Sequence, residues 1–233
     1  MNYFYNDDPE HFNFLNSEES NHCIKVLRKK KGDVIDVIDG KGNVFSCEIT
    51  ADNFRKCEFS ILDKKASNKH KPHTVHIAIA PTKNHDRLEW FVEKSSELGV
   101  DEISFITTKR TERKKINLER LDRKTLSALK QSKNLFKTKI NKLSSLKEFL
   151  ETTSNAQQKF IAFVDNKNPD YLHKIAKSGT DTLILIGPEG DFTEEEVAVA
   201  LSKGFQKISL GKSVLRTETA GVIACHSINL INE

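Results

Sequence analysis

Two hydrophobic patterns follow each other along this chain. In residues 34–38 and 44–49, β-branched and apolar residues alternate with polar ones, and a five-residue loop containing two glycines separates the two runs. This pattern is typical of antiparallel strands joined as a hairpin. Residues 57–62 are expected to form a third strand, and residues 18–27 a short helix that precedes the strands.

From residue 75 onward, short apolar runs alternate with segments in which apolar residues recur every three or four positions. The runs predict strands over residues 75–80, 103–106, 160–164, 183–186 and 207–210. The periodic segments predict helices over residues 86–98, 118–134, 146–150, 194–203 and 218–231. Strands that alternate with amphipathic helices are typical of an α/β domain with a mostly parallel, buried sheet.

The stretch between these two patterns, residues 64–73, is polar and has no apolar periodicity, as is typical of a linker. We therefore predict two domains: a small β-rich domain over residues 1–71 and an α/β domain over residues 72–233.

Composition narrows the class of protein. No apolar run approaches the ~20 residues that cross a bilayer, and the polar, acidic N-terminal residues differ from a signal peptide. The four cysteines show no C-x-x-C spacing, so we interpret them as reduced core residues rather than zinc ligands or disulfides, and we expect no metal site. Reduced cysteines and the lack of a signal-peptide pattern together predict a cytoplasmic protein. The cysteines are Cys23, Cys47, Cys57 and Cys225.

Charge is unevenly distributed. The whole chain carries a net charge of +4, but residues 108–142 hold thirteen Lys or Arg and only three Asp or Glu. Surface helices stabilised by ion pairs usually mix the two signs. This basic segment therefore favours a polyanionic partner such as nucleic acid, with a solvated helical face as the alternative.

One candidate binding loop follows the predicted strand 183–186 and reads Leu185-Ile-Gly-Pro-Glu-Gly-Asp-Phe-Thr193. In open parallel sheets, ligands bind beyond the carboxyl ends of the strands. Gly187 and Gly190 allow a ligand to approach the backbone closely. A plain turn would account for Gly187 and Pro188, but not for an acid between Pro and Gly. The glycine patterns of dinucleotide and P-loop sites are absent, which disfavours a nucleotide-dependent oxidoreductase.

A second candidate loop, residues 210–220, leads into the last predicted helix. Thr217 or Thr219 can cap that helix, and Glu218 suits its positive end. Arg216 does not fit this account, because a cation near a helix start costs a few tenths of a kcal/mol or more. We therefore expect an anionic partner or ligand for Arg216.

Together the two loops resemble the signature of the SPOUT methyltransferase family that methylates uridine N3 in small-subunit ribosomal RNA. They read Leu-Ile-Gly-Pro-Glu-Gly-x-Phe-Thr-x-x-Glu and Leu-Gly-x-x-Val-Leu-Arg-Thr-Glu-Thr-Ala. Upstream segments extend the resemblance over nearly the whole chain: residues 22–28, 94–100 and 110–113. The resemblance implies an N-terminal PUA-like β-barrel and a C-terminal SPOUT α/β domain with a trefoil knot.

The resemblance also implies S-adenosyl-L-methionine as cofactor and a homodimer. The substrate that it implies is 16S ribosomal RNA within the small ribosomal subunit. The apolar final helix, with Cys225, Ile228 and Ile231, is expected to need cover from a second copy. The residues implied in cofactor binding are Leu185, Gly187, Glu189, Gly190, Leu210, Gly211, Ser213 and Leu215. The expected RNA contacts are His22, Lys25, Arg28, Arg110, Arg113 and Lys114, with a structural role as the alternative for His22.

Methylation at uracil N3 requires the loss of the N3 proton. A carboxylate can accept that proton, and a cation beside the ring can stabilise the developing negative charge. Arg216 is our candidate for the cation, and Glu218 or Glu189 for the carboxylate; Glu189 can equally orient the cofactor. The alternative function is a noncatalytic RNA-binding factor that keeps both domains.

Three positions depart from the family pattern. Asp191 replaces a common Gly, Ser213 replaces a common Arg, and Lys130 lies where a Glu is often found. These changes bear on RNA contacts. Apart from Asp191 and Ser213, the two loops that the resemblance assigns to the cofactor keep their pattern.

Overall fold

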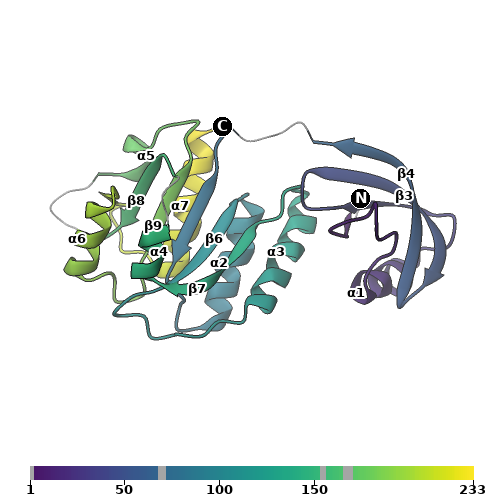
Figure 1. Cartoon of the computed structure of the whole chain (residues 1–233), viewed down its shortest axis with the longest axis horizontal. Coiled ribbons are helices and arrows are strands. Elements are labelled where there is room, and N and C mark those ends of the chain that lie inside the picture. The colour runs from purple at the N-terminus through teal and green to yellow at the C-terminus, as the bar shows by residue number, and fades with distance from the viewer. Residues whose placement is uncertain (1–2, 68–71, 153–155, 165–169) are drawn as a thin grey trace. The chain divides into compact units, whose positions relative to one another are not determined.

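The computed structural model describes residues 3–67, 72–152, 156–164 and 170–233 (Figure 1). The chain divides into two compact units, residues 1–70 with 129–137, and residues 71–128 with 138–233. Residues 129–137 thus join the first unit, although the predicted division places them in the α/β domain. The division at residues 71 and 72 itself stays a prediction, because part of the linker lies outside the described residues.

The first unit contains one four-stranded sheet with the order β1-β2-β3-β4. Its strands are β1 (Tyr3–Tyr5), β2 (Val34–Ile38), β3 (Asn43–Asn53) and β4 (Lys56–Ala66). The predicted hairpin is confirmed, because β2 and β3 are antiparallel with Val37 opposite Phe45. β1 was not predicted, and β4 runs to Ala66, beyond the start of the predicted linker at residue 64. The last residues of β4, 63–66, are mostly charged and are exposed, so no alternation of apolar and polar residues predicts this part of the strand.

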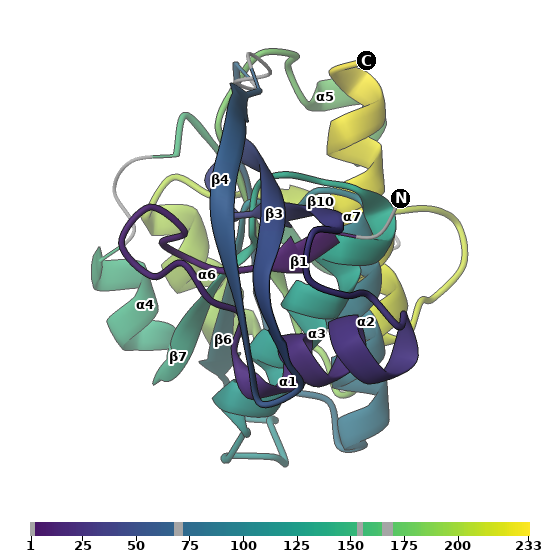
Figure 2. The ribbon, with the colours of Figure 1, turned by 90° about the vertical axis from the view of Figure 1, so that its right-hand side faces the viewer.

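A short helix packs on the long β3–β4 hairpin (Figure 2). It begins as α1 (Ser17–Asn21), capped by the Asn16 side chain, and continues as the π-helical turn η1 (His22–Val26). The Ser20 hydroxyl accepts a 2.8 Å hydrogen bond from the Cys57 backbone N–H and so fixes the helix to β4. The core beneath it consists of Phe4, Leu15, Cys23, Ile35, Val37, Phe45, Cys47, Ile49, Cys57 and Phe59.

The second unit contains a six-stranded parallel sheet with the order β10-β8-β9-β5-β6-β7. The strands are β5 (Val75–Ile79), β6 (Glu102–Thr107), β7 (Lys139–Ser145), β8 (Gln158–Ala162), β9 (Thr182–Ile186) and β10 (Gln206–Ile208). The central strand β9 is buried throughout, with Ile184 and Ile186 in one core and Leu183 and Leu185 in the other. Both faces of the sheet are therefore covered, as expected for a parallel sheet.

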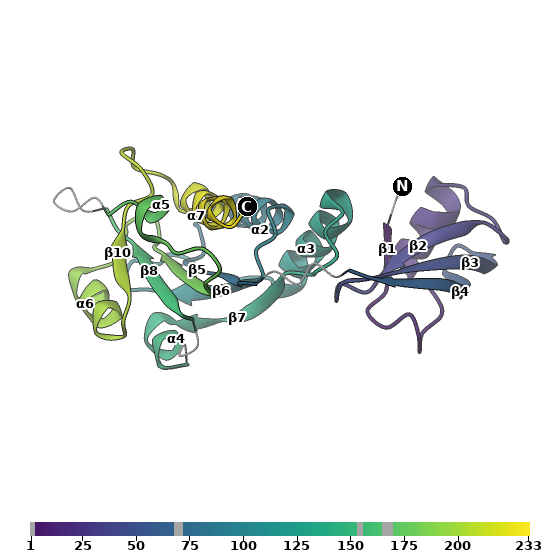
Figure 3. The ribbon, with the colours of Figure 1, turned by 90° about the horizontal axis from the view of Figure 1, so that it is seen from above.

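Helices α2, α3 and α7 lie on one face of this sheet, and α4 and α6 lie on the other (Figure 3). The helices are α2 (His85–Glu97), α3 (Leu118–Ser132), α4 (Leu146–Thr152), α5 (Leu172–Ile175), α6 (Glu194–Ser202) and α7 (Thr217–Ile231). The capping box predicted at Thr193 and Glu196 is confirmed, since each side chain accepts a hydrogen bond from the other residue's backbone N–H. Among the described residues, no helix has the length and apolar character needed to cross a membrane.

The final helix α7 is covered by its own unit. Cys225 and Ile228 are fully buried in the core shared with α2, and Gly221 lies against the ring of Phe91. Cys225 and Ile228 therefore need no cover from a second copy, whereas Leu230 on the same helix is exposed, and the homodimer stays a prediction. All four cysteines are buried and free of disulfides.

Candidate active site

A cavity of about 600 Å³ opens at the carboxyl ends of the neighbouring strands β8, β9 and β10. Described residues that follow each of these strands line it, together with the first turn of α7. This is the edge of a parallel sheet at which ligands are expected. Both candidate loops of the sequence analysis therefore meet in one cavity.

Most of the predicted cofactor residues line this cavity. They are Gly187, Glu189, Leu210, Gly211, Ser213 and Leu215. Leu185 instead points into the buried core below, and Gly190 lies against Arg110. Sequence reasoning missed Phe163, Val164 and Tyr171, which follow β8. Only the strand order reveals that β8 ends beside β9, and no sequence motif marks these three residues.

The β9–α6 loop, residues 187–193, is tightly folded. A Cβ atom at Gly187 would lie 3.1 Å from the ring of Phe192 and 3.2 Å from Asp191 Oδ1, so a side chain there meets a crowded surface. The Asp191 N–H donates a 2.9 Å hydrogen bond to the carbonyl of Pro188, which closes the turn. The loop therefore presents backbone groups, rather than long side chains, around Gly187.

Asp191 shows why the departure from a common Gly is accommodated. Its φ is 62°, in the left-handed region that favours Gly and that Asp tolerates better than most residues. Its carboxylate accepts hydrogen bonds from the backbone N–H groups of Phe192 (2.8 Å) and Val164 (3.2 Å). Burial raises the pKa of Asp191, opposed by these hydrogen bonds and by the nearby Arg110. Asp191 thus links the end of β8 to the β9–α6 loop.

Arg216 is the N-cap residue of α7, and its side chain is exposed and lines the cavity. None of the described residues forms an ion pair with its guanidinium, so the expected anionic partner is not supplied by the described part of the chain. Thr217 is the first residue of the helix, and no side chain caps it. The predicted capping by Thr217 or Thr219 was therefore wrong.

The two candidate carboxylates lie in different environments. Glu189 is exposed and lines the cavity, and its Oε1 accepts a 3.0 Å hydrogen bond from the Lys83 backbone N–H. Glu218 is only 6% exposed and does not line the cavity; its Oε1 lies 3.7 Å from Arg87 Nε on α2. Glu218 Oε2 has no hydrogen-bond partner among the described residues. This arrangement favours Glu189 for contact with a ligand.

The predicted RNA-binding residues fall into two groups. In the first unit, His22, Lys25 and Arg28 are all exposed, and Lys25 Nζ lies 3.8 Å from the centre of the Phe54 ring. In the second unit, Arg110 and Lys114 are exposed and Arg113 is half-buried; Arg110 and Arg113 also donate hydrogen bonds to backbone carbonyls. RNA contact by these residues stays a prediction.

Lys130, where the family often has a Glu, forms an ion pair with the buried Glu19 in the first unit. That carboxylate also accepts a hydrogen bond from the Tyr5 N–H. Lys130 therefore compensates a buried charge of this chain.

Comparisons with known proteins show the family to which the chain belongs. Residues 69–229 match the family model of the RNA methyltransferase domain, and residues 15–62 match that of the RNA methyltransferase PUA domain. The ribosomal RNA small subunit methyltransferase E of Mesomycoplasma hyopneumoniae (strain 232) is 33% identical over 225 residues, which cover 94% of this chain and 95% of the relative. The chain belongs to the ribosomal RNA small subunit methyltransferase E family.

Solved structures of similar proteins support the fold of this methyltransferase family. A protein of Porphyromonas gingivalis, described as a probable rRNA methyltransferase, has a TM-score of 0.94 and 39% identity, covering 100% of this chain and 98% of that one. A ribosomal RNA small subunit methyltransferase E of Neisseria gonorrhoeae, bound to S-adenosyl methionine, has a TM-score of 0.86 and 26% identity, with the same coverage. The predicted fold class, a PUA domain followed by an α/β domain with a parallel sheet, is confirmed; the knot stays a prediction.

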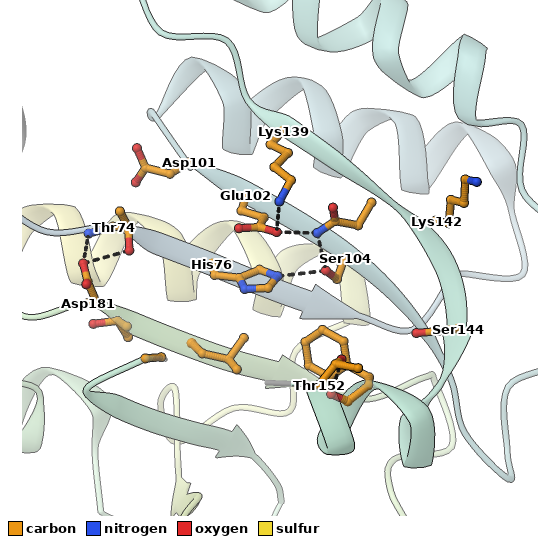
Figure 4. A pocket seen from close by; sticks show the side chains of 15 residues that line it. Thr74, His76, Asp101, Glu102, Ser104, Lys139, Lys142, Ser144, Thr152 and Asp181 are labelled. Atoms are coloured by element: carbon orange, nitrogen blue, oxygen red, sulfur yellow. Dashed lines mark hydrogen bonds and ion pairs between the residues drawn. The ribbon is translucent and has the colours of Figure 1, made fainter. Parts of the chain in front are cut away.

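A second cavity, of about 570 Å³, lies on the sheet over β5, β6, β7 and β9, away from the methyltransferase motifs (Figure 4). A hydrogen-bonded row crosses it. Asn141 Nδ2 donates to Glu102 Oε1 (2.5 Å) and to Ser104 Oγ (2.8 Å), and Ser104 Oγ lies 2.8 Å from His76 Nε2. Ser104 Oγ therefore links Asn141 to the His76 ring, as donor or acceptor toward Nε2 according to the tautomer of the ring.

We predict that His76 makes stability depend on pH. Burial lowers the pKa of His76 below its ordinary value of 6.5, against the opposing charge of Glu102. The unfolded chain then takes up a proton below pH 6.5 before the folded chain does, so the free energy of unfolding falls as pH drops through this range. The slope from one such group is at most about 1.4 kcal/mol per pH unit.

Denaturant titrations at several values between about pH 5 and 8 measure this slope. The slope is expected to be smaller in His76→Asn than in the wild type, and unchanged in His226→Asn, which alters an exposed histidine on α7. Equal slopes in His76→Asn and the wild type would contradict the prediction.

Proposed function

We propose that this protein transfers the methyl group of S-adenosyl-L-methionine to N3 of a uridine in 16S ribosomal RNA. The observation that carries the proposal is the cavity at the ends of β8, β9 and β10, in which the Gly187 loop and an exposed Arg216 meet. Family membership supports RNA methylation in general; the uridine N3 specificity rests on the sequence resemblance and on this charge arrangement.

The residues of the cavity fit S-adenosyl-L-methionine. Its walls include the apolar side chains of Val164, Ile186, Leu210 and Leu215, which suit a neutral adenosine. When bound, the cofactor supplies a methyl group on a positively charged sulfonium. Carboxylates attract such a charge, and those of Glu189 and Asp191 both line the cavity. No phosphate-binding loop is needed, in agreement with the absence of one.

Three side chains of the protein are assigned to proton transfer, charge stabilisation and support of the site. We assign Glu189 to accept the uracil N3 proton or to orient the cofactor, because its carboxylate is exposed to the cavity. Arg216 stabilises the negative charge that develops on the ring as that proton leaves. Glu218, behind the cavity and beside Arg87, acts on the first turn of α7 rather than on the substrate.

The RNA is held through its phosphates. His22, Lys25 and Arg28 provide exposed contacts in the PUA unit, and Lys114 provides one in the basic segment. We retain the homodimer and the assembled small subunit as parts of the proposal. Exposed apolar side chains on α2 and α7, namely Trp90 and Leu230, support a further contact surface.

The test is mass spectrometry of 16S ribosomal RNA from a strain that lacks the protein. One methylated uridine should become unmodified, and the wild-type chain should restore it. Calorimetry with S-adenosyl-L-methionine, and light scattering for the dimer, complete the test. Binding of RNA without any cofactor affinity, and with no change in the RNA, would instead identify a noncatalytic RNA-binding factor.

A further inference from the structure

We propose that Arg110 and Arg113 are positioning residues that hold the cofactor cavity in shape. They lie in the β6–α3 loop, residues 108–117, and reach two other loops: the β9–α6 loop, which lines the cavity, and the β5–α2 loop, residues 80–84, which contacts Glu189. The inference rests on the proposed cofactor site. It assigns these two arginines a task that their place in a basic segment does not reveal.

Arg110 holds the β9–α6 loop directly. Its Nη1 donates a 2.6 Å hydrogen bond to the carbonyl of Gly190 and lies 3.5 Å from that of Phe192. Its aliphatic part packs on Gly190, where an added Cβ would lie 3.3 Å from Arg110 Cδ. These carbonyls flank Asp191, the residue with left-handed backbone that lines the cavity. Arg110 therefore fixes the backbone on both sides of Asp191.

Arg113 acts through the β5–α2 loop. Its Nε lies 3.1 Å from both the Thr82 and the Lys83 carbonyl oxygens, and its guanidinium also contacts His85. The N–H of Lys83 in turn donates to Glu189 Oε1 at 3.0 Å. Arg113 thus holds the loop whose backbone orients the one predicted catalytic carboxylate that lines the cavity.

A backbone contact adds a third point of attachment. The Lys109 N–H donates a 2.8 Å hydrogen bond to Glu196 Oε1, in the first turn of α6. The β6–α3 loop therefore contacts the β9–α6 loop at Gly190, in its middle, and contacts Glu196 just beyond its end. A planar guanidinium with several fixed donors suits the bridging of two carbonyls, whereas an ammonium is a single point charge.

The experiment compares Arg110→Ala and Arg113→Ala with Lys115→Ala in the full-length protein. Lys115 is exposed in the same loop, so the control removes the same charge. Losing a charged hydrogen bond that shapes the site should raise the dissociation constant for S-adenosyl-L-methionine about 10-fold in both arginine variants. In Arg110→Ala, amide hydrogen exchange in residues 187–193 should also quicken without cofactor. Neither quantity should change in Lys115→Ala.

A conservative variant separates positioning from charge. Arg110→Lys keeps the charge but not the fixed fork of donors, so its dissociation constant should lie between those of the wild type and Arg110→Ala. Cofactor affinity and exchange that match Lys115→Ala in all arginine variants would overturn the inference, whatever happens to RNA binding. A wild-type protein with no cofactor affinity would instead overturn the proposed function. Should Arg110→Ala fail to fold, Arg110→Lys decides by the same measurements.

Discussion

Arg216→Ala is expected to slow methyl transfer by about 10²–10³-fold, the usual effect of removing one preorganised charge that meets developing negative charge. The guanidinium stands at the N-cap of α7, where the helix dipole disfavours a cation. It is exposed to the cavity, and no described residue neutralises it. A position that costs stability and offers no internal partner is explained best by an external negative charge, such as that of the reacting uracil.

Single-turnover transfer to small ribosomal subunits measures this effect, with thermal unfolding and cofactor binding recorded on the same preparation. Lys212→Ala is a matched control, because Lys212 is an exposed cation that lines the same cavity on the same loop. Its rate should fall far less than that of Arg216→Ala. Turnover of Arg216→Ala close to the wild type would refute the assigned role, and a parallel loss of stability would make Arg216 a structural residue.

The position of the candidate site could be predicted from the sequence, because two independent regularities point to it. Gly187 and Gly190 follow a wholly apolar strand, and the second loop precedes an apolar helix. In a parallel sheet, the ends of such strands share one edge. That edge is where the cavity lies. The local signals were sufficient there because strand direction fixes which end of each strand carries the site.

Partners distant in sequence could not be predicted. Helical periodicity places Glu218 in the first turn of α7 but does not show that it turns toward Arg87. The composition of the basic segment does not show that Arg110 and Arg113 donate hydrogen bonds to carbonyls of other loops, and its role as a surface for a polyanion stays a prediction. Strand β7 was missed because an edge strand with many polar residues lacks an apolar run. Each of these features depends on a contact with another helix, strand or loop, and the local sequence does not show that contact.

The close packing of α7 on α2 gives the second large expected effect: Gly221→Ala should destabilise the protein. A Cβ at Gly221 would lie 2.8 Å from Phe91 Cδ2 and 3.1 Å from Ile79 Cδ1, both in fully buried side chains. Overpacking of this kind costs about 1–3 kcal/mol. Replacing Gly with Ala in a helix interior stabilises the helix by about 1 kcal/mol. We expect the cost of the clash to exceed this gain, because both contacted side chains are fully buried.

A double-mutant cycle with Phe91→Leu isolates the clash. The smaller side chain makes room for the added methyl group, so the cost of Gly221→Ala should drop by about 0.5–3 kcal/mol in that background. Ser227→Ala on the same helix controls for helix propensity and should change stability by no more than about 0.5 kcal/mol. Denaturant unfolding measures all four corners of the cycle.

Because Arg216 and Thr217 begin this helix at the cavity, Gly221→Ala should also weaken cofactor binding, and Phe91→Leu should partly restore it. An equal cost of Gly221→Ala in both backgrounds would show that the ring of Phe91 does not limit the approach of α7.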